Sequence, residues 1–317
     1  MDAIKIGVIM DPIEQINIKK DSSFAMMLAA QKKNWDIFYI RPEDLSVIDS
    51  KVHVIATRVT VEDNADKWFQ SHETINTPMQ NLDTILMRKD PPFNMDYIYL
   101  TYLLELAEKD GVLVVNKAAS IRDANEKLFT AMFPQCCVPN LVSKNMAQLK
   151  VFIQEQKDAI LKPLDGMGGS SIFRVRADDP NLNVIIETLT DNGQTMTMAQ
   201  QFIPDITNGD KRILLIDGEP VPYALARIPA KGETRGNLAA GGTAKGQPLT
   251  DRDRWICKQV APILKEKGLL FVGIDVIGDY LTEINVTSPT CIRELDQQFN
   301  LDIATDLMNA IESKLNK

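Results

Sequence analysis

Short apolar runs typical of β-strands alternate with longer helical runs through the first third of the chain. The alternation covers Ile4–Met10, Ser22–Lys33, Ile37–Ile40, Thr84–Arg88, Met95–Lys109 and Val112–Val115. This order predicts a parallel sheet covered by helices, because parallel strands need crossover connections. Ligands bind beyond the carboxyl ends of such strands, where this chain places Asp11, the turn from Arg88 to Pro92, and Asn116-Lys117.

Two further α/β parts follow. Residues 1–124 form the predicted N-terminal domain, residues 125–203 a small lobe and residues 204–317 a C-terminal lobe. The small lobe is expected to begin with a helix over Asn125–Phe133. In the C-terminal lobe we expect a helix from Asp251 to Lys267 and strands at Lys211–Ile216, Pro220–Ile228, Phe271–Ile277 and Leu281–Val286.

The bulk composition excludes several classes of protein. The net charge of −8 opposes binding to nucleic acid, and no window approaches the roughly 18 uninterrupted apolar residues of a membrane span. The start MDAIKIGVIMDP lacks the features of a signal peptide, so we expect a cytoplasmic protein. Neither GxGxxG after the first strand nor GxxxxGK[ST] occurs, which disfavours Rossmann and Walker-type nucleotide binding.

A lysine stands at the end of a predicted strand, directly before a glycine-rich turn, in the segment ILKPLDGMGGSS. Lys162 is followed there by Gly166, Gly168 and Gly169. Small residues let backbone amides approach the oxygens of a polyphosphate, and the lysine adds a positive charge. The segment fits a phosphate-binding turn, and it equally fits a β-hairpin with a surface lysine.

A second glycine-rich stretch runs from Gly232 to Gly242 and includes Arg235. It cannot pack a core of its own, so it forms either a disordered surface loop or a mobile lid over a ligand, and the arginine favours the lid. Arg212 and Arg227 lie on neighbouring predicted strands. Each is either a surface charge or, with Lys162 and Arg235, part of a local positive field in an acidic chain.

The segment Gly273–Val286 predicts two strands joined in an antiparallel ribbon. Burial of its apolar residues on one face requires a register in which Asp275 pairs with Glu283, and this register implies a three-residue loop, Gly278–Tyr280. We expect a two-residue loop to separate the two carboxylates.

Asp275, Glu283 and Asn285 then share the polar face of the ribbon, with no histidine or cysteine beside them. Two carboxylates and an amide oxygen form an all-oxygen ligand set suited to Mg²⁺ that bridges nucleotide phosphates. The alternative is an ordinary solvated face of an antiparallel sheet.

Lys162 before the glycine-rich turn, then Asp275, then the Glu283-x-Asn285 pair follow the motif order of ATP-grasp enzymes. The stretches NIKKDSSFAM, ILMRKDPPF, ILKPLDGMGG, ARIPAKGETRGNLAAGG and LTEINVTSPTCIRE resemble the bacterial glutathione synthetase family, and the similarity spans nearly the whole chain. The resemblance implies an ATP-grasp fold, with an N-terminal parallel α/β (pre-ATP-grasp) domain, a small central lid lobe and a C-terminal α/β lobe.

The resemblance also implies roles for individual residues. Nucleotide binding is implied for Lys127, Lys162, Gly166, Gly168 and Gly169 at the phosphates, for Gln200, Gln201, Phe202 and Ile203 at the adenine, and for Asp210 at the ribose. Asp275, Glu283 and Asn285 are implied ligands of Mg²⁺ or Mn²⁺, with two ions expected. The acceptor is assigned to Lys20, Ser22, Arg88, Arg227, Asn237, Ser288 and Thr290, and stabilisation of the transition states to Lys162, Arg212 and Arg235.

The implied reaction joins γ-glutamylcysteine to glycine through an acyl phosphate and releases ADP and phosphate, and the implied assembly is a homotetramer. Two alternatives stay open: another ATP-grasp ligase with a different acceptor, and a nucleotide-binding protein without turnover. The stretches NIKKDSS and MRKDPPF favour the glutathione acceptor, and the three metal ligands favour catalysis.

Overall fold

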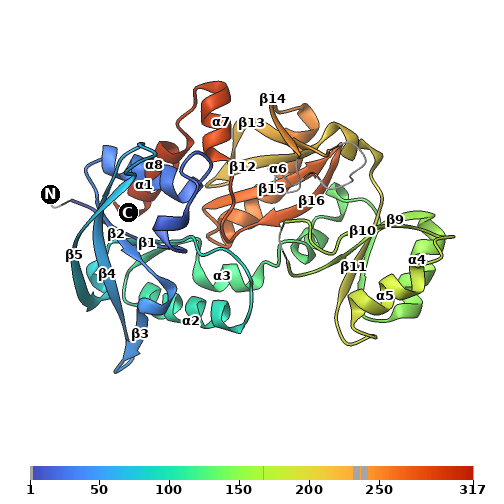
Figure 1. The fold of residues 1–317 in the computed structure, drawn as a ribbon, viewed down its shortest axis with the longest axis horizontal. Coiled ribbons are helices and arrows are strands. Elements are labelled where there is room, and N and C mark those ends of the chain that lie inside the picture. Colours follow the sequence, from blue (N-terminus) through green and yellow to red (C-terminus); the bar gives the residue numbers. More distant parts are fainter. Residues whose placement is uncertain (1–2, 167, 231–235, 237–241, 317) are drawn as a thin grey trace.

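The computed structural model describes residues 3–166, 168–230, 236 and 242–316, and the chain folds around three sheets (Figure 1). A seven-stranded sheet lies in the N-terminal part, a four-stranded sheet in the middle part and a five-stranded sheet in the C-terminal part. The predicted α/β class is confirmed. The limits drawn between the three parts stay predictions.

The centre of the N-terminal sheet is parallel, as predicted. Its strands are β2 (Asp36–Ile40), β1 (Lys5–Ile9), β6 (Thr84–Met87) and β7 (Leu113–Val115), in that spatial order. Helices α1 (Ser22–Lys32) and α2 (Met95–Lys109) begin at the side-chain caps Asp21 and Asn94, and α3 (Ala118–Asp123) follows β7. The C-terminal helix α8 (Ile303–Leu315) returns to pack on α1, so the two ends of the chain share one core.

The same sheet contains three antiparallel strands that the sequence analysis missed: β3 (Leu45–Ile48), β4 (Lys51–Val61) and β5 (Phe69–Pro78). Strand β4 pairs with β2, β3 and β5. The predicted parallel sheet is therefore confirmed for the centre of the sheet, and the antiparallel part was not predicted. Strand β5 is an edge strand exposed along most of its length, so its sequence lacks the apolar alternation that reveals a half-buried strand.

The small lobe is an antiparallel sheet in the order β10, β9, β11, β8, packed against α4 and α5 (Figure 1). Its elements are β8 (Asn140–Ser143), α4 (Met146–Gln156), β9 (Asp158–Pro163), β10 (Phe173–Arg176), α5 (Leu182–Thr190) and β11 (Thr197–Gln201). The helix predicted over Asn125–Phe133 is instead a pair of short 3-10 helices, η4 (Leu128–Met132) and η5 (Pro134–Cys136). The Asn125 side chain accepts hydrogen bonds from the next backbone amides, and Pro134 ends the first turn.

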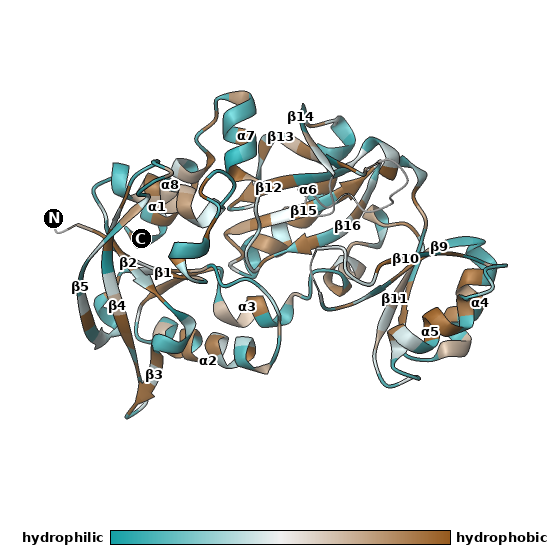
Figure 2. Ribbon diagram, viewed as in Figure 1, coloured by the Kyte–Doolittle hydropathy of each residue, from teal (hydrophilic) through white to brown (hydrophobic). Residues whose placement is uncertain are grey.

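The C-terminal lobe contains an antiparallel sheet in the order β14, β13, β12, β15, β16. Its strands are β12 (Asp210–Ile216), β13 (Glu219–Ile228), β14 (Thr243–Pro248), β15 (Phe271–Ile277) and β16 (Tyr280–Asn285), and its helices are α6 (Asp251–Glu266) and α7 (Ile292–Phe299). Strands β12 and β15 pair along their whole lengths and show long hydrophobic stretches (Figure 2). A capping box between Thr250 and Asp253 starts α6. Strand β14 was not predicted.

Candidate active site

A cavity of about 370 Å³ lies where the three parts of the chain meet. The N-terminal domain contributes Asp90 and Pro91 to its wall, and the segment before η4 contributes Glu126 and Lys127. Strand β9, the glycine-rich turn and residues 200–203 come from the small lobe, while β12, β13, β15, β16 and residues 287–290 come from the C-terminal lobe. The glycine-rich turn after Lys162 and the carboxylates of the Gly273–Val286 segment therefore face the same cavity.

The β15–β16 ribbon has the predicted register where it matters for the site. Asp275 pairs with Glu283, and Gly273 pairs with Asn285. The predicted three-residue loop is wrong, because β15 ends at Ile277 and β16 begins at Tyr280. A β-bulge next to Asp275 shifts the register by one residue, so the short loop and the facing carboxylates coexist.

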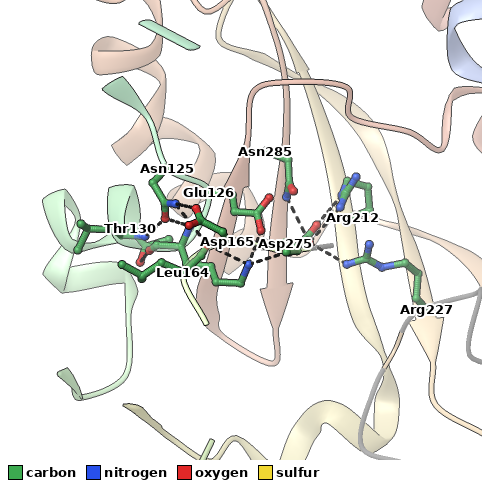
Figure 3. A network of polar contacts seen from close by, with 12 residues as sticks. Asn125, Glu126, Thr130, Leu164, Asp165, Arg212, Arg227, Asp275 and Asn285 are labelled. Carbon is green, nitrogen blue, oxygen red and sulfur yellow. Dashed lines mark hydrogen bonds and ion pairs between the residues drawn. The ribbon is translucent and has the colours of Figure 1, made fainter. Parts of the chain in front are cut away.

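Asp275 is buried beside two arginines, Arg212 on the adjacent strand β12 and Arg227 on β13 (Figure 3). Arg212 donates two hydrogen bonds to its carboxylate, at 2.5 Å from Nε and 3.0 Å from Nη2, and Nη2 of Arg227 lies 2.9 Å from its Oδ2. Burial alone raises the pKa of Asp275, but the charges of Arg212 and Arg227 outweigh burial and hold the pKa well below its ordinary value. Asp275 is therefore a permanent anion that orients both arginines.

The predicted metal ligands lie together on the cavity wall. Glu283 and Asn285 line the cavity beside Asp275, and Nδ2 of Asn285 is 3.4 Å from Oδ2 of Asp275 (Figure 3). No group of three or more histidine, cysteine or acidic side chains in the described part of the chain is arranged to hold a metal alone. The oxygen donors fit Mg²⁺ or Mn²⁺ only if substrate oxygens complete the ligand set. Asp275 can take part only by sharing oxygens that already accept from arginines.

Lys162 and Lys127 approach the cavity from the small-lobe side, and both are buried. Burial lowers the pKa of Lys162, and the nearby Glu283 carboxylate opposes this effect. Nζ of Lys127 pairs with Glu126 and donates to the backbone oxygen of Gly166 at 3.1 Å. Lys162 is thus not the exposed lysine of a plain hairpin, although β9 and β10 do form one around the glycine-rich turn.

Glu126 is a cavity residue that the sequence analysis missed. Burial raises its pKa, and the Glu283 carboxylate adds to this effect while Lys127 opposes it. The backbone oxygen of Glu126 also accepts the Ile284 amide at 2.8 Å, which ties the segment before η4 to the β15–β16 ribbon. Its position directly before Lys127 was the only sequence signal.

The residues predicted to surround the nucleoside also line the cavity. Gln200 and Gln201 end β11, Phe202 and Ile203 follow it, and Asp210 begins β12. Burial raises the pKa of Asp210 to about 6, even though Arg227 lies 2.5 Å from its Oδ2 and opposes the shift. The remaining oxygen, Oδ1, is buried and accepts no hydrogen bond from a described residue.

The predicted acceptor residues divide into two groups. Arg227, Ser288 and Thr290 line the cavity, whereas Lys20, Ser22 and Arg88 are not part of its wall. The buried Arg88 donates to Ser23 Oγ and to the backbone oxygen of Pro289, both at 3.0 Å. Ser22 Oγ accepts the Ile292 amide at 3.3 Å. Their direct contact with an acceptor stays a prediction.

Asp90 is a second cavity residue that the sequence analysis missed. Its Oδ1 accepts a hydrogen bond from Ser288 at 2.6 Å, across the junction between the N-terminal domain and the C-terminal lobe. The charged turn Arg88-Lys89-Asp90 at a strand end was noted in the sequence, but only Arg88 was selected from it.

Arg235 and Asn237, with most of the predicted lid, lie outside the described residues. Gly236 between them is buried and lines the cavity. A Cβ atom at this position would lie 2.6 Å from the Arg227 backbone oxygen and 2.9 Å from Asp210 Cβ. Glycine is therefore required where this segment touches the sheet.

Comparison with known proteins identifies the family. Residues 4–122 match the model of the prokaryotic glutathione synthetase N-terminal domain, and residues 126–300 match the model of the prokaryotic glutathione synthetase ATP-grasp domain. The chain belongs to the prokaryotic glutathione synthetase family. It is therefore an ATP-grasp enzyme, a carboxylate–amine ligase, as the sequence motifs predicted.

Similar curated proteins include the glutathione synthetases of Pseudomonas putida, at 59% identity over 99% of both chains, and Coxiella burnetii, at 56% identity over 98% of this chain and 97% of the relative. Among solved structures, D-cycloserine synthetase DcsG has a TM-score of 0.68 at 14% identity, covering 98% of this chain and 99% of its own. The ATP-grasp ligase PsnB with its minimal precursor has a TM-score of 0.64 at 17% identity, covering 99% of both chains. These two structures confirm the ATP-grasp fold.

No helix in the described ranges is both long and apolar enough to span a membrane.

Proposed function

We propose that the chain forms glutathione from γ-glutamylcysteine and glycine, with conversion of ATP to ADP and phosphate. The identity of 56–59% to glutathione synthetases along nearly the whole chain is the observation on which this proposal rests. The cavity agrees with it, because cationic and anionic groups of all three parts meet there.

In the proposed first step, an oxygen of the acceptor's cysteinyl carboxylate attacks the γ-phosphorus of ATP. The new O–P bond gives an acyl phosphate, and the bond to the bridging oxygen breaks to release ADP. Negative charge spreads over the transferred phosphoryl oxygens in this step. Lys162 and Arg212 lie on the cavity wall, where Asp275 holds the Arg212 guanidinium in place, and we assign to them the stabilisation of this charge.

In the second step, the glycine amine attacks the acyl carbon, and phosphate leaves from the tetrahedral intermediate. Charge builds on the former carbonyl oxygen, so Arg212 or Arg227 is the proposed partner. Asp275 keeps both guanidinium groups aimed at this region. A metal ion, when bound, supplies further positive charge beside the phosphate oxygens, and Glu283, Asn285 and Asp275 would hold it.

The nucleotide is proposed to lie between the small and C-terminal lobes. Residues 200–203 would contact the adenine and Asp210 the ribose, while Lys127, Lys162 and the glycines at 166, 168 and 169 would surround the phosphates. Oδ1 of Asp210 has no hydrogen-bond partner among the described residues and so offers an acceptor for a ribose hydroxyl, which supports this placement.

Arg235 and Asn237 are proposed to complete the site from the lid. An acyl phosphate hydrolyses readily, so a lid would exclude water until the amine attacks. Shortening the lid should raise ATP hydrolysis relative to peptide formation. Unchanged coupling in the shortened enzyme would contradict the lid.

The decisive experiment measures phosphate release with Mg-ATP and γ-glutamylcysteine, with and without glycine, together with mass detection of the tripeptide. Release that depends on glycine and equals the glutathione formed is the expected result. Turnover without tripeptide would indicate an ATP-grasp ligase with another acceptor. Nucleotide binding without turnover would indicate a non-catalytic protein. The expected homotetramer and cytoplasmic location are tested by sedimentation and by fractionation.

A further inference from the structure

Arg174 touches the wall of the cavity from outside it. This residue is on β10, and its guanidinium carbon lies 3.6 Å from the centre of the Phe202 ring. Phe202 is half-buried and lines the cavity, whereas Arg174 does not. Such a short distance indicates a guanidinium group stacked on the aromatic face.

Asp158 fixes both partners of this stack. Arg174 donates from Nε to Oδ1 at 3.0 Å and from Nη2 to Oδ2 at 2.6 Å, so the ion pair is two-pronged and sets the plane of the guanidinium group. The backbone oxygen of Asp158 accepts the Phe202 amide at 3.1 Å. One residue at the start of β9 therefore holds the Phe202 backbone and, through Arg174, the Phe202 ring.

Phe202 lies where the chain leaves the small lobe. Strand β11 ends at Gln201, and the chain then enters η6 (Pro204–Asn208) and the C-terminal lobe. The side chains of Arg174 and Asp158 are 32% and 30% exposed, so solvent screens their ion pair and limits its contribution to the free energy of unfolding. Global stability is therefore a weak reason for this arrangement, and control of the cavity wall is a better one.

We propose that Arg174 is a positioning residue for the nucleotide base, acting through the Phe202 ring and backbone that it holds with Asp158. The proposal rests on the placement of adenine at residues 200–203 in the proposed function. It makes nucleotide affinity, and not acceptor or glycine affinity, the property that depends on Arg174.

The test compares Arg174→Met with Arg176→Met. Arg176 is on the same strand, is exposed, and has no side-chain hydrogen bond or ion pair to another described residue, so its variant makes the same charge change without touching Phe202. For Arg174→Met we expect the KM for ATP and the calorimetric Kd for ADP to rise about five- to tenfold, with the KM for acceptor and glycine within twofold of wild type. Arg176→Met should match wild type. Arg174→Lys should recover only part of the affinity, because lysine lacks the planar fork.

A third variant, Phe202→Ala, separates this proposal from the function on which it rests. If Phe202→Ala weakens ADP binding and Arg174→Met does not, the role of Arg174 is refuted while the adenine placement stands. If neither variant changes ADP binding, both the role of Arg174 and the placement of adenine at residues 200–203 are refuted. A fall in Tm with equal rises in all three KM values would show a merely structural residue, and would also overturn the proposal.

Discussion

At the proposed metal end of the cavity, Asp275, Glu283 and Asn285 lie on two adjacent strands of one antiparallel ribbon. At the proposed acceptor end, Arg88 of the N-terminal domain lies behind the cavity wall and reaches the Pro289 backbone oxygen, 201 residues away along the chain. The first group is local in sequence, and strand alternation alone brings it to one face. The second exists only because two separately formed parts pack together.

The two ends also differ in how charge is balanced. Asp275 at the metal end is matched by Arg212 and Arg227 in a buried network. Arg88 at the acceptor end has neutral partners, Ser23 Oγ and a backbone oxygen, and burial lowers its pKa against the charges of Asp21 and Asp90. Substitutions at the metal end should therefore change the charge balance and the rate of turnover. Substitutions at the acceptor end should instead change the packing between the domains and the affinity for the acceptor.

The largest effect is expected for Asp275→Ala. The change leaves the buried Arg212 without its anion, while Arg227 keeps Asp210 as a partner, so the free energy of unfolding should fall by about 3–5 kcal/mol. Turnover should fall by at least about 100-fold as the arginines lose their orientation. Urea unfolding and phosphate release measure both. Asp279→Ala, an exposed change in the loop of the same ribbon, should leave both unchanged.

Lys162→Met should separate activity from stability at the same end. Burial lowers the pKa of Lys162, so the folded state disfavours its ammonium form, and methionine removes this cost. We expect turnover to fall about 100- to 1,000-fold while the free energy of unfolding stays equal or rises. Loss of stability comparable to that of Asp275→Ala would contradict this view. Lys258→Met, an exposed change on α6, is the control.

Arg88→Met tests the acceptor end. Two hydrogen bonds from a charged donor disappear, so the free energy of unfolding should fall by about 1.5–3 kcal/mol and the KM for γ-glutamylcysteine should rise about tenfold. ADP affinity, measured by calorimetry, should not change. Equal losses of ADP and acceptor affinity would remove the distinction between the two ends. Arg88→Lys should not restore both contacts, since lysine lacks the fork.

Asp210→Asn should reveal a dependence of stability on pH. The folded-state pKa of about 6 lies above the ordinary value of 3.8, so the wild-type protein loses stability as pH rises through this window. Asparagine does not titrate, and the stability of the variant relative to wild type should increase by about 1–3 kcal/mol between pH 4 and pH 7.5. Urea unfolding in metal-free buffer at both values measures the difference. A pH-independent difference would show that Asp210 is not perturbed.

Ser288→Ala should have the smallest effect. It removes one hydrogen bond, to Asp90 across the domain junction, in a partly exposed position. We expect a change of at most about 1 kcal/mol in the free energy of unfolding and a two- to fivefold rise in acceptor KM. Asp90→Asn should give a similar rise, and no added effect in the double variant would show that the two residues act as one pair.

Sequence patterns were most reliable where they describe one strand or one helix. Helix α2 begins and ends where predicted, and Asp275 faces Glu283 as expected. The predicted length of the loop beside them was wrong, because a β-bulge adds a residue to one strand and the alternation of apolar residues does not reveal it. Strand β5 was missed because an exposed edge strand needs no apolar pattern, whereas β4 was missed although its buried residues alternate along the strand.

The amino-acid sequence by itself determined the α/β class, the polar face of the β15–β16 ribbon, the glycine-rich turn and, through its motifs, the family. These features depend on neighbours within a few residues, where the periodicity of strands and helices applies. Only the tertiary structure decided that Glu126 and Asp90 enter the cavity, that Arg88 lies behind its wall, and that Arg174 stacks on Phe202. Each of these depends on packing between separate elements, and the free energy of such packing has no local signature in the chain.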